Sequence, residues 1–382
     1  IIRKGVMKGA INATNNYDDI KNYKIFIISV NTPINNKYDV NLRFFVEALK
    51  SLSKIIKKGS LVIIRSTIPP LTIKNVVIPM FDKINFKLSK DYYLARVPER
   101  LAEGHALKDM RENPLIIGAT DELTYVMVEK LFEPLKLKSI RLSYEEAELV
   151  KLADNMWIDL NIALANELAL VSEKIGGDIR KVIDAANTLK KGSSYVNILT
   201  PGIGVGGSCL PKDPYILHRF SKKLGINLRL PIVSRKVNDY MPLHVYNLIK
   251  NNTNVNDKKV LILGVSFNSN SGDMRYSPSI FLNNKLQEEG YSVYAYDPLV
   301  NETDFQVLKN VVRIKTEEEL MKLLEKINIL VVGAKHDVFQ PLINKIMEKI
   351  RNKTIIDGRY LFDPEKVNKI DVKYIAVGVG KK

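Results

Sequence analysis

The single cysteine of this chain, Cys209, lies in a loop whose composition favours a reactive thiol. The loop, residues 202–214, reads Gly-Ile-Gly-Val-Gly-Gly-Ser-Cys-Leu-Pro-Lys-Asp-Pro. Its glycines lack a Cβ and allow the backbone to approach a ligand closely. The prolines and Asp213 that follow are typical of a helix start, where the positive end of the helix stabilises a thiolate. Most lone cysteines are small buried hydrophobic residues, but in this loop we predict a nucleophile.

Lys151 and Asn155 form a second candidate pair, because they lie four residues apart in a predicted helix. Side chains at that spacing emerge on the same helix face. Both are hydrogen-bond donors and suit an alkoxide or oxyanion formed next to a thiolate. The alternative, a solvated helix face, is the more common role of such a pair.

Two glutamates, Glu99 and Glu103, follow a predicted strand in the segment Arg96-Val-Pro-Glu-Arg-Leu-Ala-Glu-Gly104. Open α/β sheets bind ligands at the carboxyl ends of their strands. A role in a site and a role on the surface are therefore both open for this pair.

Residues 202–207 also match the dinucleotide-binding pattern G-x-G-x-x-G. That fingerprint needs a preceding strand and a helix that opens at its third glycine. Here Thr200-Pro201 comes before the glycines, and Cys209-Leu-Pro211 interrupts the expected helix. We therefore predict that the loop is not a dinucleotide turn. We expect the first strand, the glycine turn and the second strand of a nucleotide-binding sheet to precede Ile1.

Composition indicates a globular protein from a reducing compartment, with 46% hydrophobic and 26% charged residues among 382. This length predicts two or three domains, and a single cysteine cannot form an intramolecular disulfide. We find no apolar run that could span a bilayer and no secretory signal, so we expect a cytoplasmic protein. The net charge of +16 comes from scattered lysines and arginines. A charge of this size could indicate a nucleic-acid partner, but the scatter of the basic residues and the lack of a nucleic-acid motif argue against one. The positive charge favours an anionic small-molecule substrate, and we predict no metal site.

Short apolar, β-branched runs alternate with helical patterns along the first part of the chain. The runs predicted as strands are residues 24–30, 60–65, 92–97 and 114–118, and a helix is expected over 39–57. This alternation indicates a mostly parallel sheet with helices on both faces.

A long helix is predicted from residue 144 to about residue 175, with Leu149, Leu152, Met156 and Leu160 along one stripe. Its length exceeds that of most domain helices, so it should bridge domains or form an oligomer interface. A shorter helix (179–186), the Cys209 loop with its helix, and a polar linker (251–257) follow. The strands expected beyond the linker are residues 259–263, 292–296, 327–332 and 354–356. The expected fold class is α/β, with two Rossmann-like parallel-sheet domains joined by a long central helix and the first β-α-β lying before Ile1.

Together these features resemble the UDP-glucose/GDP-mannose dehydrogenase family over essentially the whole chain. Seven segments carry the resemblance and occur in the family's order. They are Val30-Asn-Thr-Pro33, Ser66-Thr-Ile-Pro69, Val97-Pro-Glu-Arg-Leu-Ala-Glu103, Lys151-Leu-Ala-Asp-Asn155, the Cys209 loop through Asp213, Arg235-Lys-Val-Asn238, and Asp273-Met-Arg-Tyr-Ser-Pro278.

The resemblance implies oxidation of the C6 hydroxymethyl group of a nucleotide sugar to a carboxylate, with two NAD. Cys209 would attack the C6 aldehyde, and the resulting thiohemiacetal would be oxidised to a thioester that water hydrolyses. Lys151 and Asn155 would support the alcohol oxidation and the oxyanions, and Asp213 would position water. Glu99 and Glu103 match glutamates near the reacting carbon, and one of the two is a candidate base for hydrolysis of the thioester.

The resemblance also implies the binding residues and the domains. Those matched to NAD are Thr32, Thr67, Glu103 and Arg275, and those matched to the sugar nucleotide are Arg96, Val97, Lys151, Asn155, Tyr195, Gly206, Arg235 and Phe267. Arg235 would reach the site of a neighbouring subunit, and the long helix would form the core of a homodimer or dimer-based oligomer. The expected domains are an NAD-binding domain (1–140), a central helical and dimerisation region (141–250) and a UDP-sugar-binding domain (251–382).

The sequence of the Cys209 loop bears on the identity of the sugar. Gly204-Val-Gly-Gly207, Asp213-Pro214 and the upstream Val196-Asn197 resemble the UDP-N-acetylhexosamine branch, with UDP-N-acetyl-D-mannosamine as the first candidate. Leu210-Pro-Lys212 is closer to the UDP-glucose and GDP-mannose pattern, and UDP-glucose is the alternative substrate.

Three positions depart from the family. Ser193 and Tyr195 stand where acetylhexosamine enzymes commonly have His and Arg, and Asn268 stands where the family usually has Lys. An unreplaced cation at such a site costs on the order of 1–3 kcal/mol. Two other hypotheses are a non-catalytic nucleotide-sugar-binding paralogue and a two-electron hydroxyacid dehydrogenase, and the second leaves Cys209 unexplained.

Overall fold

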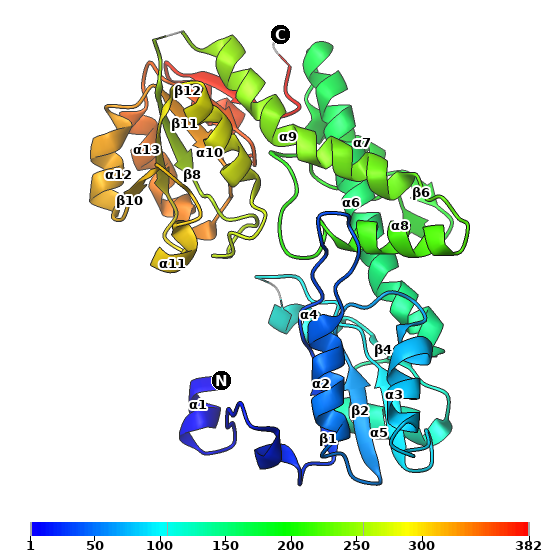
Figure 1. Ribbon diagram of the computed structural model, residues 1–382. Coiled ribbons are helices and arrows are strands. Elements are labelled where there is room, and N and C mark those ends of the chain that lie inside the picture. The colour runs from blue at the N-terminus through cyan, green and yellow to red at the C-terminus, as the bar shows by residue number, and fades with distance from the viewer. Residues whose placement is uncertain (1, 105, 255, 381–382) are drawn as a thin grey trace. The chain divides into compact units, whose positions relative to one another are not determined.

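A computed structural model describes residues 2–104, 106–254 and 256–380 of the chain. The chain divides into two compact units, Ile1–Asp154 (unit one) and Asn155–Lys382 (unit two). The boundary falls within helix α6 (Tyr144–Lys174), which has 31 residues. Figure 1 shows each unit as a sheet with its own helices.

Unit one contains a five-stranded sheet in the order β1-β2-β3-β4-β5. Its strands are β1 (Ile25–Ile28), β2 (Ser60–Ile64), β3 (Tyr92–Arg96), β4 (Leu115–Gly118) and β5 (Ser139–Leu142). All neighbours are parallel except β3 and β4, which meet antiparallel at Arg96 and Gly118. Every residue of β2 is buried, as the continuous apolar run predicts for a strand covered on both faces. The four strands predicted for this part of the chain are confirmed.

The helices of unit one are α1 (Ile2–Met7), α2 (Arg43–Ser53), α3 (Ile78–Asp82), α4 (Ala106–Glu112) and α5 (Glu122–Phe132). One apolar core joins α2 and α3 to the sheet, and a second joins α5 to it. Helix α2 is shorter than predicted, because asparagine side chains hold residues 35–41 in turns. Asn35 accepts the backbone N–H groups of Lys37 and Asp39, and Asn41 accepts that of Arg43; such bonds compete with a helix.

Unit two contains a six-stranded sheet whose neighbouring strands are all parallel. The strands are β8 (Lys259–Leu263), β9 (Ser292–Tyr296), β10 (Val312–Ile314), β11 (Ile329–Val332), β12 (Thr354–Asp357) and β13 (Lys373–Ala376). Their order, β10-β9-β8-β11-β12-β13, is the 3-2-1-4-5-6 order of dinucleotide-binding sheets. The chain is thus α/β with two sheets and a long helix, and the Rossmann-like strand order is observed in the second sheet.

Helices cover both faces of the second sheet (Figure 1). Helices α9 (Leu230–Asn252) and α10 (Pro278–Glu288) pack on one face, together with part of α6. Helices α12 (Glu317–Leu324) and α13 (Ile343–Lys349) pack on the other. The remaining elements of unit two are α7 (Ile179–Ala186), the hairpin of β6 (Lys190–Lys191) and β7 (Ser194–Tyr195), α8 (Asp213–Lys223), α11 (Glu302–Phe305) and α14 (Pro364–Val367).

Two sequence-based expectations need correction. Helix α9 was not predicted, and it extends to Asn252, into the expected linker 251–257, of which residue 255 lies outside the described residues. The apolar stripe expected on α6 is also wrong in part, since Leu152 is buried but Leu149 is exposed. Besides Leu152 and several alanines, the buried positions of α6 carry polar residues, namely Glu148, Lys151, Asn155, Asp159 and Asn166.

Candidate active site

Cys209 lies in a tight turn that leads directly into α8. The backbone N–H groups of Lys212 and Asp213 both donate to the Cys209 carbonyl, at 3.0 and 2.9 Å. The thiol is free and half-buried, with Sγ 3.7 Å from the Ser208 hydroxyl oxygen. The predicted helix start is confirmed, although Lys212 is the cap and Asp213 the first helical residue. The thiol therefore lies one turn ahead of a helix N-terminus and is not enclosed in an apolar core.

The glycines of the Cys209 loop are required by close packing against residues 267–278. A Cβ on Gly206 would lie 2.5 Å from the Tyr276 carbonyl oxygen, and one on Gly207 would lie 2.7 Å from the Phe267 ring. Gly207 also has φ +88° and donates its N–H to the Arg275 carbonyl at 2.8 Å. The structure thus brings Gly206, Phe267 and the backbone of Arg275 together beside the cysteine loop.

The start of the same loop is fixed by the buried Asn166 and the partly buried Arg359, neither of which was predicted from the sequence. Asn166 of α6 accepts the Gly202 N–H at 2.9 Å, and Arg359 donates to the Gly204 carbonyl at 3.0 Å. Burial lowers the pKa of Arg359 to about 10. Arg359 follows β12 in Asp357-Gly-Arg359, and its position after a strand is the signal that could have identified it.

Asp213 is fully buried and bonded to two polar side chains. The Asn155 amide donates to Oδ2 at 2.5 Å, and the Lys212 ammonium lies 2.5 Å from Oδ1. Two residues predicted to act at the reacting centre, Asn155 and Asp213, are therefore in direct contact within unit two. The carboxylate fixes the orientation of the Asn155 amide.

Lys151 pairs with Glu99 within unit one, with Nζ 3.6 Å from Oε2. The other Glu99 oxygen accepts the Leu101 N–H. Lys151 and Asn155 are both buried, so the alternative of a solvated helix face is wrong. The Lys151–Glu99 pair joins an ammonium to a carboxylate and can hold or transfer a proton.

Thr32 and Thr67 follow the neighbouring parallel strands β1 and β2, and the structure brings them into contact. The buried Thr32 hydroxyl donates to the Thr67 carbonyl at 2.5 Å. Loops at the carboxyl ends of parallel strands form the ligand edge of an open α/β sheet. Glu103 lies exposed in the loop after β3.

The remaining predicted residues differ in whether their side chains are accessible to a ligand. Val97 is buried in an apolar core, so only its backbone could take part. Arg96 is fully buried, donates to the Ile64 carbonyl at 2.9 Å, and leaves Nε and Nη2 without a hydrogen-bond partner among the described residues. Burial lowers the pKa of Arg96 to about 10. Tyr195 is 60% exposed in the β6–β7 hairpin, and the exposed Arg275 side chain pairs with Asp273.

Arg235 is buried within its own chain. Its guanidinium bonds Asp159 at 2.6 Å and also pairs with Asp239. Nη2 lies 3.5 Å from the Val205 carbonyl of the cysteine loop. Arg235 thus supports this loop in cis, and the expected contact with a neighbouring subunit stays a prediction.

A second polar pair that the sequence analysis missed lies at the carboxyl edge of the second sheet. His336 Nε2 lies 3.1 Å from Asp297 Oδ2, and His336 Nδ1 accepts the Asn270 N–H at 2.8 Å. Burial opposes ionisation of Asp297, but bonds from His336 and from backbone N–H groups hold its pKa below the usual value. This pair anchors the loop that carries Phe267.

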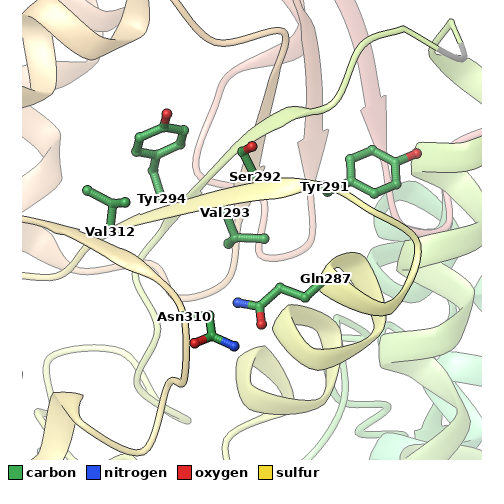
Figure 2. Close-up of a pocket in the computed structure, with 7 residues that line it drawn as sticks. All are labelled: Gln287, Tyr291, Ser292, Val293, Tyr294, Asn310 and Val312. Atoms are coloured by element: carbon green, nitrogen blue, oxygen red, sulfur yellow. The ribbon is translucent and has the colours of Figure 1, made fainter.

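A cavity of about 400 Å³ lies elsewhere in unit two (Figure 2). It is lined by Gln287, Tyr291, Ser292, Val293, Tyr294, Asn310 and Val312. These residues lie around the amino ends of β9 and β10, whereas the Phe267 loop follows the carboxyl end of β8. The cavity therefore does not belong to the candidate site. Within the described ranges, no His, Cys, Asp or Glu cluster could hold a metal ion, and no described helix is long and apolar enough to cross a membrane.

Three family models match successive parts of the chain. They describe the NAD binding domain (residues 1–136), the central domain (145–240) and the UDP binding domain (261–364) of one family. The chain belongs to the UDP-glucose/GDP-mannose dehydrogenase family, and is an NAD-dependent nucleotide-sugar dehydrogenase.

Individual relatives carry two different substrate names. The chain is 35% identical to a UDP-N-acetyl-D-mannosamine dehydrogenase of Methanocaldococcus jannaschii, over 98% of this chain and 85% of that protein. It is 30% identical to the UDP-glucose 6-dehydrogenase YwqF of Bacillus subtilis, over 99% and 86%. Its fold matches a solved UDP-D-ManNAc dehydrogenase from Pyrococcus horikoshii with a TM-score of 0.85 and 30% identity, covering 100% of this chain and 87% of the other.

The residues of unit one fit the cofactor that the family uses. Thr32 and Thr67 place hydroxyl and carbonyl groups side by side at the carboxyl edge of β1 and β2. The backbone around them is fixed by the Ser66 hydroxyl, which bonds both the N–H and the carbonyl of Val30 at 2.8 Å. NAD supplies the hydride acceptor when bound.

Proposed function

We propose that this enzyme oxidises C6 of a UDP-N-acetylhexosamine, UDP-N-acetyl-D-mannosamine, to the uronic acid in two steps of two electrons each. The observation that carries the proposal is the half-buried Cys209 thiol in a loop packed tightly on residues 267–278, next to the contacting pair Asn155 and Asp213. A covalent thiol intermediate divides one difficult oxidation into easier steps.

The first oxidation removes a hydride from C6 to NAD and the hydroxyl proton to a base. The Lys151–Glu99 pair supplies both groups needed here, since the ammonium stabilises the developing alkoxide and the carboxylate can accept the proton. Glu103 is the alternative base. The aldehyde that results is the substrate for the thiol.

The second oxidation proceeds on Cys209. The thiolate sulfur bonds to C6, and the carbonyl oxygen takes up a proton to give a thiohemiacetal. Loss of a second hydride to NAD and of the hydroxyl proton gives a thioester. Water then attacks the thioester carbon as Glu99 or Glu103 accepts one of its protons, the C–S bond breaks, and the carboxylate, the thiolate and the second proton are released. Asn155 donates to the oxyanions, and Asp213 fixes its amide.

The identity of the sugar rests on the relatives and on the cysteine loop. Five relatives named UDP-N-acetyl-D-mannosamine dehydrogenase are 30–35% identical to the chain, and Val205 fits the acetylhexosamine branch. UDP-glucose is the second candidate, supported by Leu210-Pro-Lys212 and by the Bacillus subtilis relative.

The proposal also covers the assembly and the setting of the enzyme. One side of α6 exposes Trp157, Leu164 and Val171, which are 49%, 45% and 57% exposed. They recur every seven residues, as in helices that pack against a partner helix, so we place a homodimer interface here. A single, free cysteine fits a reducing compartment, for which we propose the cytoplasm. The proposed domain limits stay at 1–140, 141–250 and 251–382.

The test is NADH production by the full-length enzyme with a panel of UDP-sugars. We expect two NADH per sugar, and a higher kcat/KM for UDP-N-acetyl-D-mannosamine than for UDP-glucose. Cys209→Ala should abolish formation of the uronic acid while UDP-sugar binding persists, because only the nucleophile is removed. A yield of one NADH per sugar, or an active Cys209→Ala variant, would contradict the mechanism. A preference for UDP-glucose would select the second candidate.

A further inference from the structure

Glu148 of α6 is fully buried, and both of its carboxylate oxygens bind the backbone of one loop. The Leu71 N–H donates to Oε2 at 2.6 Å, and the Ile73 N–H donates to Oε1 at 2.8 Å. A buried carboxylate that accepts two backbone N–H groups makes strong, charge-assisted hydrogen bonds. Glu148 therefore fixes the far end of the loop that leaves β2.

This loop carries Thr67 and leads from β2 into a π-helical turn (Ile73–Val77), of which Ile73 is the first residue. Its near end is held at Val30 and Thr32 by the bonds described above. Leu71 has φ +65°, a left-handed conformation that a leucine rarely adopts. Such a conformation persists only where the surroundings hold it, and the Glu148 carboxylate provides that support at the Leu71 N–H itself.

The carboxyl group is set to titrate near neutral pH. Burial raises the pKa of Glu148 to about 7, and Glu145 adds to this effect, while the two backbone bonds and the Arg96 guanidinium oppose it. The ionised group accepts both N–H groups. In the protonated group one oxygen is a hydroxyl, which is a weaker acceptor. One of the two backbone N–H groups, that of Leu71 or that of Ile73, is then bound less strongly.

We propose that Glu148 is a positioning residue for the cofactor: through Leu71 and Ile73 it fixes the loop that presents Thr67 to NAD. The inference rests on the proposed role of Thr32 and Thr67 in NAD binding. It predicts that the ionised carboxylate holds the loop in the binding conformation and that the protonated one releases it.

The first test is Glu148→Gln in the full-length enzyme. The amide keeps one acceptor oxygen but turns an N–H₂ group toward a backbone N–H. We expect the Kd and KM for NAD to rise about tenfold at pH 8, the scale of one lost charge-assisted hydrogen bond. The KM for the UDP-sugar and the kcat at saturating NAD should not change. Glu145→Gln, the same change one turn earlier on α6, is the matched control.

The second test is the pH dependence of NAD affinity. In the wild-type enzyme the affinity should rise as pH increases through about 7, because ionisation tightens the loop. In Glu148→Gln the affinity should stay low across this range. Glu145→Gln should keep the rise in affinity but move it to lower pH, because it removes a charge that raises the pKa of Glu148. Calorimetry with NAD alone, in two buffers of different ionisation enthalpy at pH 7, should show proton release on binding to the wild type.

Three results would overturn the inference. They are an unchanged pH dependence in Glu148→Gln, a loss of kcat with unchanged NAD affinity, and the absence of proton release in the wild type. The last measurement needs no variant and so decides the matter even if Glu148→Gln does not fold. Because it uses NAD without sugar, it also separates this inference from the proposed function, which fails if no UDP-sugar yields NADH.

Discussion

At the scale of single residues, the buried carboxylates near the cysteine loop are held by donors on more than one side. Asp213 is contacted by Asn155 from α6 and by its neighbour Lys212. Asp159 accepts bonds from Ser234, Arg235 and Asn238 of α9. A buried charge is tolerated when it is paired and hydrogen-bonded. These carboxylates therefore contribute to the shape of the site as well as to its chemistry.

Asp213→Asn should lower both stability and activity. The substituted amide turns a donor toward either Asn155 or Lys212, which leaves a buried donor unsatisfied. We expect the free energy of unfolding to fall by about 2 kcal/mol, and kcat to fall because the Asn155 amide loses its fixed orientation. Denaturant unfolding and steady-state kinetics measure the two effects. Lys222→Gln, at the solvated end of α8, is the control, and equal stability of Asp213→Asn and wild type would contradict the argument.

Some residues of the candidate site could be predicted from the sequence, and others could not. Cys209, Lys151 and Asn155 stand out because their types and spacing have chemical meaning. Glu148 lies three residues before Lys151 on the same helix face, and this spacing could have identified it. Arg359 and His336 have no such spacing, and only their positions after strands β12 and β11 could have identified them. Their contacts are with loops distant in sequence.

At the scale of elements, the backbone of the cysteine loop packs directly against the backbone of residues 267–278. A Cβ at Gly206 would meet the Tyr276 carbonyl oxygen at 2.5 Å, and a carbonyl at the start of α10 cannot move aside like a flexible side chain. Gly206 has no left-handed φ, so the constraint here is steric alone.

Gly206→Ala should therefore displace the cysteine loop from residues 267–278. We expect a loss of at least tenfold in kcat/KM for the UDP-sugar, since a small misplacement of a catalytic group has large effects. Gly225→Ala is the control, because that glycine has φ +77° and nothing within 4 Å of the added Cβ. It should cost about 1 kcal/mol of stability through backbone strain and leave kcat/KM unchanged. Normal activity of Gly206→Ala would show that the close approach is not needed.

Physical reasons explain why three strands and one helix were not predicted from the sequence. Strands β5, β10 and β13 were missed, and all three are edge strands with exposed positions. Central strands such as β2 are buried on both faces and give continuous apolar runs, whereas these three edge strands do not. Helix α9 contains Pro242, which the helix accommodates, and proline weakens a helical pattern in sequence. The apolar stripe predicted on α6 was wrong in part, because several buried positions of this helix carry polar residues.

At the scale of the whole molecule, both sheets present their candidate residues at the carboxyl ends of parallel strands. Thr32 and Thr67 follow β1 and β2, and the Phe267 loop, Asp297, His336 and Arg359 follow β8, β9, β11 and β12. This arrangement follows from the parallel strand direction, because all carboxyl ends then lie at one edge. The parallel strand direction therefore indicates where candidate residues lie, although Asp297, His336 and Arg359 were not selected from the sequence.

The proposed dimer interface lies on α6, which exposes Trp157, Leu164 and Val171. Leu164→Glu places a charge on this apolar side and should convert a dimer to a monomer, because a desolvated charge without a partner is costly. Analytical ultracentrifugation at micromolar concentration measures the change. Leu123→Glu, at an exposed leucine of α5, is the control and should leave the dimer intact.

Trp157 is the only tryptophan of the chain, so its fluorescence should shift to longer wavelength in Leu164→Glu as the ring enters water. A wild-type monomer, or a dimer that survives Leu164→Glu with unchanged fluorescence, would place the interface elsewhere.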